Sequence, residues 1–133
     1  MTANIDGIHH IAIICSDYAK SKDFYIAVFN GKLISEDFRE SRNSMKGNIL
    51  LPGGGQIELF SFPDTPTRMS RPEACGLRHF AIRVIDLELE RERLEQLGID
   101  LEPIRLDSGT NKRFCFFADP DNLPIELYEE PKQ

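Results

Sequence analysis

The sequence lacks tryptophan and contains only three cysteines and three histidines among its 133 residues. Three scattered cysteines cannot build a disulfide framework, and their odd number indicates reduced thiols and a cytoplasmic location. Basic residues are also scarce, since 16 Lys and Arg stand against 22 Asp and Glu, which gives a formal net charge of -6. A chain of that sign has no general attraction to phosphate backbones, so we expect no nucleic-acid partner.

Long apolar runs are missing as well. No stretch approaches the roughly 20 apolar residues of a membrane-spanning helix, and residues 1–7 are too short and polar for a signal peptide. We therefore expect no membrane partner. Hydrophobic residues still make up 41% of the chain, which is enough for one hydrophobic core and predicts a single globular domain over residues 1–133.

The chain contains an internal duplication. Residues 10–13 (HIAI) match residues 79–82 (HFAI), and residues 57–60 (IELF) match residues 125–128 (IELY). The two offsets differ by one residue, and Asp17 falls on Asp86 at the first of them. Two matched tetrapeptides in the same order are hard to obtain by chance, so the sequence predicts two repeat units, at about 7–63 and 76–131.

Each repeat carries the same pattern of expected elements. Strands at 8–15 and 77–84 are followed by helices, the first beginning at Ser16 or Asp17 and ending near Asn30, the second beginning at Asp86 and ending at Gly98. Three more strands follow each helix, separated by turn residues; they are expected at 32–38, 46–51 and 56–62, and at 100–105, 113–117 and 123–128. The breaker-rich stretch 63–76 is the linker. The fold class is therefore α+β, with two tandem βαβββ units.

Two of the three histidines, His10 and His79, occupy equivalent positions in the duplication, as do Glu58 and Glu126. Each glutamate stands between two hydrophobic residues of a strand, so its side chain points to the opposite face, which aromatic residues share. A carboxylate buried there alone would cost several kcal/mol. It must be paired, protonated or bound to a metal.

We therefore predict that these four residues bind one divalent metal ion, because two imidazoles and two carboxylates neutralise a 2+ charge and leave positions for water or substrate. Such a ligand set suits Zn, Ni, Co, Mn or Fe, and the sequence does not select among them. His9 adjoins His10, but only His10 matches His79. The alternative is that duplication preserved two buried His–Glu pairs with no metal, since a single buried histidine is usually a core residue.

With these motifs the chain resembles the vicinal oxygen chelate superfamily, which includes glyoxalase I, bleomycin-resistance proteins, fosfomycin-resistance enzymes, extradiol dioxygenases and methylmalonyl-CoA epimerase. His10, Glu58, His79 and Glu126 stand where that superfamily places its metal ligands, and the segment 119–128 (DPDNLPIELY) is the most specific match. The resemblance implies paired βαβββ units that form a curved, partly closed mixed sheet around the metal site. It also implies a homodimer, with the ligands meeting within one chain or across two.

The His-Glu-His-Glu set resembles glyoxalase I most. That resemblance implies a metal-dependent lyase or isomerase of the lactoylglutathione lyase type, which moves a proton between adjacent carbons of a small carbonyl or hemithioacetal substrate and stabilises an enediolate. Glu126 would be the catalytic base, and Glu58 the more persistent ligand with a secondary catalytic role. The glutathione contacts of bacterial glyoxalase I are replaced by Ile14 and Phe62, so the thiol is left open.

Other functions remain open at this point: an oxygenase, an epimerase, a thiol transferase, or a protein that binds a small ligand and confers resistance. Four arginines are candidates for binding a carboxylate or phosphate of the substrate; they are Arg39, Arg71, Arg78 and Arg113. A solvated charged surface is the commoner role of such residues. Cys115 lies on the same expected strand as Arg113, either facing the same pocket or serving as a buried structural thiol.

Overall fold

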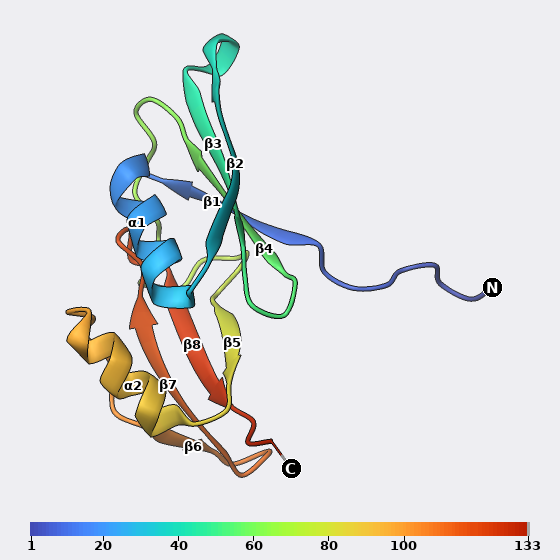
Figure 1. The fold of residues 1–133 in the computed structure, drawn as a ribbon, viewed down its shortest axis with the longest axis vertical. Helices are drawn as coiled ribbons and strands as arrows, with labels where there is room; N and C mark the ends of the chain where they lie inside the picture. Colours follow the sequence, from blue (N-terminus) through green and yellow to red (C-terminus); the bar gives the residue numbers. More distant parts are fainter. Residues whose placement is uncertain (133) are drawn as a thin grey trace. The chain divides into compact units, whose positions relative to one another are not determined.

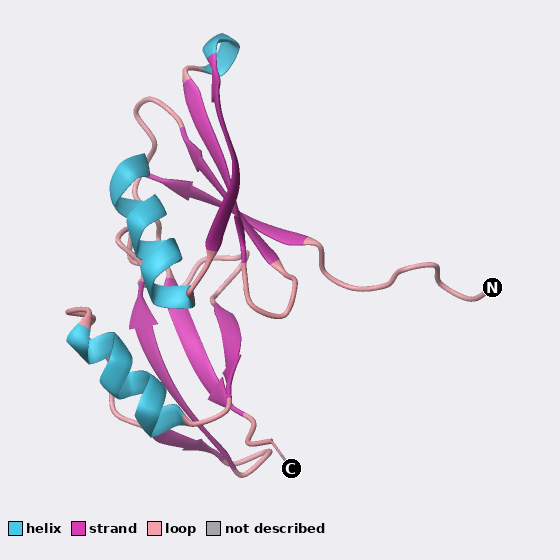
Figure 2. Cartoon of the chain, viewed as in Figure 1, coloured by secondary structure: helices cyan, strands magenta, loops and turns pink. Residues whose placement is uncertain are grey.

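The computed structural model describes residues 1–132, which form two compact units, Met1–Pro66 and the segment that starts at Thr67. Figure 1 shows the course of the chain through both units. Each unit has the predicted βαβββ order, and Figure 2 shows that each combines one long helix with a sheet. The predicted α+β class and the two βαβββ units are therefore confirmed. No helix within residues 1–132 has the length and apolar character needed to span a bilayer.

The first unit is a four-stranded mixed sheet with the order β1-β4-β3-β2. β1 and β4 are parallel, and the other neighbours are antiparallel. Its elements are β1 His10–Cys15, α1 Tyr18–Phe29, β2 Lys32–Arg39, the short 3-10 helix η1 Glu40–Arg42, β3 Ser44–Leu50 and β4 Gln56–Ser61.

The second unit repeats this topology with the order β5-β8-β7-β6 and a parallel β5–β8 pair. Its elements are β5 Phe80–Val84, α2 Leu87–Gln96, β6 Arg105–Asp107, β7 Lys112–Ala118 and β8 Pro124–Glu129. The hydrogen-bonded strands thus form two sheets, one in each unit.

Both predicted helix starts are confirmed. The side chain of Asp17 accepts a hydrogen bond from the amide of Lys20, and that of Asp86 accepts one from the amide of Leu89, so each aspartate satisfies a free donor of the first turn. α1 ends where Asn30 takes the left-handed conformation, with φ of 51°. Gly98, with φ of 81°, follows the end of α2.

One expected strand is wrong in position. The segment 100–105 was expected to form it, but β6 covers only Arg105–Asp107. The amide of Glu102 donates to the carbonyl of Phe116, yet Pro103 follows and has no amide hydrogen with which to continue the ladder. β1 and β5 also begin later than expected, at His10 and Phe80, where their pairing with β4 and β8 begins.

The core of each unit lies between its helix and one face of its sheet. In the first unit Ile57 and Leu59 of β4 are fully buried together with Tyr25 of α1. In the second unit Ile125 of β8 and Leu94 of α2 are fully buried in the equivalent way. Because side chains alternate along a strand, the residues between these core positions point to the other face of the sheet. That face carries the candidate site residues.

Candidate metal centre

The first His–Glu pair lies at the start of β1 and the middle of β4. Nε2 of His10 is 3.3 Å from Oε2 of Glu58. β1 and β4 run parallel with Ala12 opposite Glu58, so His10, two residues earlier, projects from the same face of the sheet. The histidine and glutamate predicted from the sequence are therefore neighbours in the first unit.

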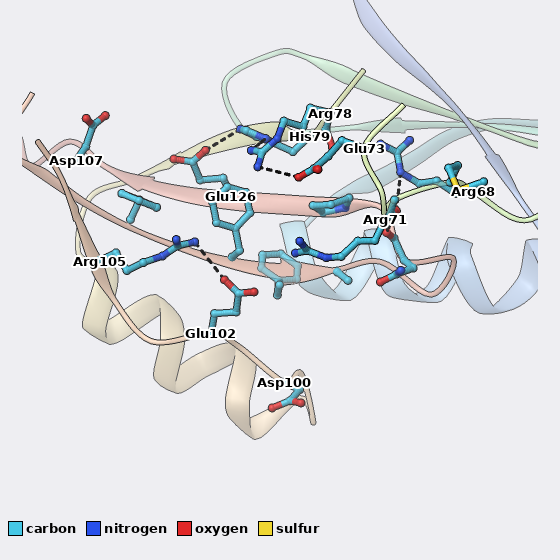
Figure 3. A pocket seen from close by; sticks show the side chains of 18 of the residues that line it. Arg68, Arg71, Glu73, Arg78, His79, Asp100, Glu102, Arg105, Asp107 and Glu126 are labelled. Carbon is cyan, nitrogen blue, oxygen red and sulfur yellow. Dashed lines mark hydrogen bonds and ion pairs between the residues drawn. The ribbon is translucent and has the colours of Figure 1, made fainter. Parts of the chain in front are cut away.

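The second pair repeats this arrangement. Nε2 of His79 is 2.9 Å from Oε2 of Glu126. Ala81 lies opposite Glu126 across the parallel β5–β8 pair, and His79 again stands two residues before that alanine. Figure 3 shows the two side chains pointing toward each other. The duplication therefore preserves the register of the pair as well as the residue types.

Both glutamates are buried, with 9% of each residue exposed. The hydrophobic neighbours of Glu58 in β4, Ile57 and Leu59, are fully buried on the opposite face, as the strand pattern predicted. A carboxylate in such a position needs a partner, because its desolvation costs several kcal/mol. In each unit that partner is an imidazole, which is also a common metal ligand.

Each unit by itself offers two ligands. Within residues 1–132 no group of three or more His, Cys, Asp and Glu side chains is arranged to hold a metal ion. The donors that are present, one imidazole nitrogen and one carboxylate oxygen per unit, suit a divalent transition metal. Each His–Glu pair thus has the donors of one half of the predicted metal site, and the two pairs have the same composition.

The other ring nitrogen of each histidine also has a neighbour, which sequence reasoning missed. Nδ1 of His9 lies 2.9 Å from Nδ1 of His10, and Nη1 of Arg78 lies 3.4 Å from Nδ1 of His79. In both units the residue just before the histidine therefore contacts its ring. Such contacts orient a metal-binding imidazole. The signal in the sequence is the adjacent position, which places His9 beside His10 and Arg78 beside His79.

The surroundings of the two pairs differ. Nζ of Lys46 lies 3.7 Å from Oε1 of Glu58, so this carboxylate has a cationic neighbour on β3. In the second unit Phe116 stands opposite Glu126 on β7, and its ring meets the imidazole of His79 edge-on with 4.9 Å between centroids. One carboxylate therefore has an ammonium group beside it, and the other has an aromatic ring. The two halves are chemically distinct despite their common origin.

The second unit contains a cavity of about 760 Å³ next to its pair. Figure 3 shows this cavity with many of the side chains that line it. His79 and Glu126 line it, and Phe114 and Phe116 contribute aromatic surface. Four arginines also line it, from the segment before β5 and from β6; they are Arg68, Arg71, Arg78 and Arg105.

The four arginines predicted to bind substrate separate into two groups. Arg71 and Arg78 line the cavity. Arg39 is instead the exposed last residue of β2, and Arg113 binds the carboxylates of Glu88 and Glu129. Arg113 projects from the face of β7 that carries the core, because residues alternate along the strand.

The prediction for Cys115 left two alternatives, and the structure selects the structural thiol. Cys115 is fully buried, and burial raises the pKa of its thiol. Arg105, which the sequence had not distinguished from other charged residues, lines the cavity above Phe114 and Phe116. Only the pairing of β6 with β7 brings that arginine over the two rings.

Comparison with known proteins agrees with these features. Residues 7–127 match the family model described as the Glyoxalase/Bleomycin resistance protein/Dioxygenase superfamily. The protein YwkD of Bacillus subtilis (strain 168) is 55% identical over 126 residues, which are 95% of this chain and 98% of that protein.

Two solved structures are informative. The crystal structure of the glyoxalase family protein from Enterococcus faecalis superposes with a TM-score of 0.87 at 40% identity, covering 92% of this chain and 97% of that one. A mutant of the fosfomycin resistance protein FosX from Listeria monocytogenes, complexed with Mn(II) and 1S,2S-dihydroxypropylphosphonic acid, superposes with a TM-score of 0.71 at 25% identity, covering 93% and 92%. The chain belongs to the Glyoxalase/Bleomycin resistance protein/Dioxygenase superfamily.

Proposed function

We propose that this protein is a metal-dependent, glyoxalase I-like lyase or isomerase that moves a proton between adjacent carbons of a small carbonyl or hemithioacetal substrate. The observation that carries this proposal is the repeated pair, in which a histidine and a buried glutamate stand at the same strand register in both units. Stability alone does not explain such a pair in both units, because a buried ionic pair is rarely more stabilising than hydrophobic packing.

We propose that His10, Glu58, His79 and Glu126 together hold one divalent ion, two ligands coming from each unit. The ion would supply Lewis acidity that stabilises negative charge on the substrate oxygens. The manganese in the FosX complex supports a divalent metal in this superfamily. Zn, Ni, Co, Mn and Fe remain the candidates.

The difference between the two pairs suggests separate roles for the glutamates. Glu126 would accept the proton from one substrate carbon and return it to the next, because the aromatic ring of Phe116 beside it provides no competing charge. Glu58, whose Oε1 lies 3.7 Å from Nζ of Lys46, would serve as the more persistent metal ligand. Arg71 and Arg78 would contact the substrate in the cavity of the second unit.

A second candidate function is resistance to a phosphonate antibiotic. The similarity to FosX, whose structure contains Mn(II) and a phosphonic acid, favours this candidate. Glu58 argues against it, because the complete His-Glu-His-Glu set resembles glyoxalase I most. We also propose that the protein is a homodimer, as its resemblance to this family implies, and that it is cytoplasmic, as its three scattered cysteines indicate.

The experiment begins with purified protein stripped by a chelator and reloaded with one divalent ion at a time. Bound metal is measured by mass spectrometry, and turnover is measured with methylglyoxal plus several thiols and, separately, with fosfomycin. We expect one metal ion per site and turnover of a thiol adduct. Glu126→Gln should lower turnover by about 10²-fold or more, as loss of a general base does.

Glu92→Gln, a substitution at an exposed position of α2, is the matched control and should change neither metal content nor turnover. The proposal fails if the wild-type protein binds no metal above background and the Glu58→Gln and Glu126→Gln variants have the same metal content as each other. Turnover of fosfomycin alone would select the second candidate.

A further inference from the structure

The cavity of the second unit has two ends with different chemistry. His79 and Glu126 form one end. At the other, the guanidinium of Arg105 lies over the rings of Phe114 and Phe116, at 5.1 and 5.5 Å from their centroids. Phe116 also touches His79, so one aromatic ring separates the histidine from the arginine. The two ends are thus connected by one aromatic surface.

Arg71 approaches the same space from another segment. Figure 3 shows Arg71 and Arg105 extending into the cavity from opposite sides. Within residues 1–132, Arg71 forms no ion pair or hydrogen bond, although it lines the cavity. A guanidinium without a carboxylate partner, in a cavity that a second guanidinium also lines, creates a position where negative charge is stabilised.

The neighbouring arginines are already engaged. Arg78 lies 3.5 Å from the carboxylate of Glu73, and Arg68 donates hydrogen bonds to the carbonyls of Leu77 and Arg78. Neither has the free donors of Arg71. Arg105 is intermediate, because its contact with Glu102, at 3.2 Å, is between two side chains that are each more than half exposed. An exposed ion pair of this kind contributes little to stability, so Arg105 can readily leave Glu102 for a better acceptor.

Acidic residues also line the cavity, but Asp107, the last residue of β6, already binds other groups of the chain. Asp107 accepts hydrogen bonds from the amide of Gly109 and the hydroxyl of Tyr128, and these contacts hold its pKa below the usual range. Both oxygens of this carboxylate are therefore already engaged, one by the turn that follows and one by β8. Glu73 and Glu102 are the partners of Arg78 and Arg105.

We propose that Arg71 and Arg105 bind an anionic group of the substrate, a carboxylate, phosphonate or phosphate, while Phe114 and Phe116 contact its carbon chain. The assignment of the reacting end to His79 and Glu126 rests on the proposed function, whereas the anion site does not. The substrate class is then a small acid in which a carbon chain separates the reactive oxygens from the charged group.

The test is a calorimetric titration of the full chain, stripped of metal so that no anion can bind through an ion. Inorganic phosphate, methylphosphonate and acetate are titrated separately, and their relative affinities identify the preferred acid. We expect Arg71→Ala and Arg105→Ala each to weaken binding of the preferred anion about ten-fold, as loss of a charge-assisted contact does. Arg93→Ala is the control, because Arg93 binds Glu90 on α2 and does not line the cavity.

Binding that is unchanged in either cavity variant, or no saturable binding of any of the three anions to the wild-type chain, would overturn the proposal. Equal weakening by Arg93→Ala would also overturn it, because only the net charge would then matter. Metal binding is measured separately, on portions of the same stripped protein that are reloaded with zinc or manganese. Anion binding without metal binding refutes the proposed function and leaves this site intact, while the reverse result refutes this site alone.

Discussion

Nε2 of His79 lies 2.9 Å from Oε2 of Glu126, and the same pair of atoms lies 3.3 Å apart in His10 and Glu58. Each histidine lies at, or just before, the start of the first strand of its unit, and each glutamate lies in the last strand of that unit. A pair that a duplication has kept at one register is the strongest reason to test for metal.

The first prediction concerns the histidines. His10→Ala and His79→Ala should each lower metal affinity by at least about ten-fold, because each removes a proposed ligand. Equilibrium dialysis against zinc or manganese measures the effect. His9→Ala should have the smaller effect of an orienting neighbour, so an equal loss in His9→Ala and His10→Ala would contradict the assignment of His10.

A second prediction concerns Gly47 of β3, which faces Tyr18 of α1. A Cβ added at Gly47 would overlap the tyrosine hydroxyl, which donates a hydrogen bond to Glu36 at 2.6 Å. Gly47→Ala should therefore lower the free energy of unfolding by about 1–3 kcal/mol, the usual cost of overpacking. Urea denaturation measures it.

The double variant Tyr18→Phe/Gly47→Ala provides the control, because removing the hydroxyl removes the nearest obstacle. Its loss of stability should be smaller than the sum of the two single losses. Strict additivity would show that the clash is not with the hydroxyl.

A third prediction concerns pH. The guanidinium of Arg113 binds Glu129, which is 8% exposed, and together with the amide of Leu87 it lowers the pKa of that carboxyl. A carboxyl with a lowered pKa in the folded state stabilises the fold above its unfolded pKa. This contribution disappears as the pH falls through the folded value.

The Arg113→Ala variant should therefore have a Tm several degrees below that of the wild-type protein at pH 7. This difference in Tm should shrink as the pH falls below about 4. Thermal unfolding followed by circular dichroism over this range checks both statements. Arg83→Ala, at an exposed position of β5, is the control. A difference that grows toward acid pH would contradict the sign of the argument.

A fourth prediction concerns the helix starts. Asp17→Ala and Asp86→Ala should each lower the free energy of unfolding by about 1 kcal/mol, since each removes the acceptor for a free amide of the first turn. Replacement by asparagine, which caps equally well, should preserve stability. Equal losses with alanine and asparagine would indicate that the charge matters rather than the cap.

Much of the fold could be predicted because its signals are local. Asp17, Asp86 and Gly98 mark helix ends by their own chemistry, and the alternation around Glu58 predicted which face it would occupy. Strand β6 was misplaced because its extent depends on pairing with β7, and Pro103 interrupts that pairing. Arg105 was missed for the same reason, since its place over Phe114 results from a contact between strands.

The sequence by itself determined the duplication, the α+β class and the four residues of the two His–Glu pairs. These follow from residue type and order, which the chain carries before it folds. Only the tertiary structure decided the register of each pair and which arginines face the cavity, because both depend on hydrogen bonds between segments distant in the chain. In the tertiary structure Arg71 lies at the cavity, whereas Arg113 binds Glu129. Residue type alone could not distinguish these two arginines, because their side chains are identical.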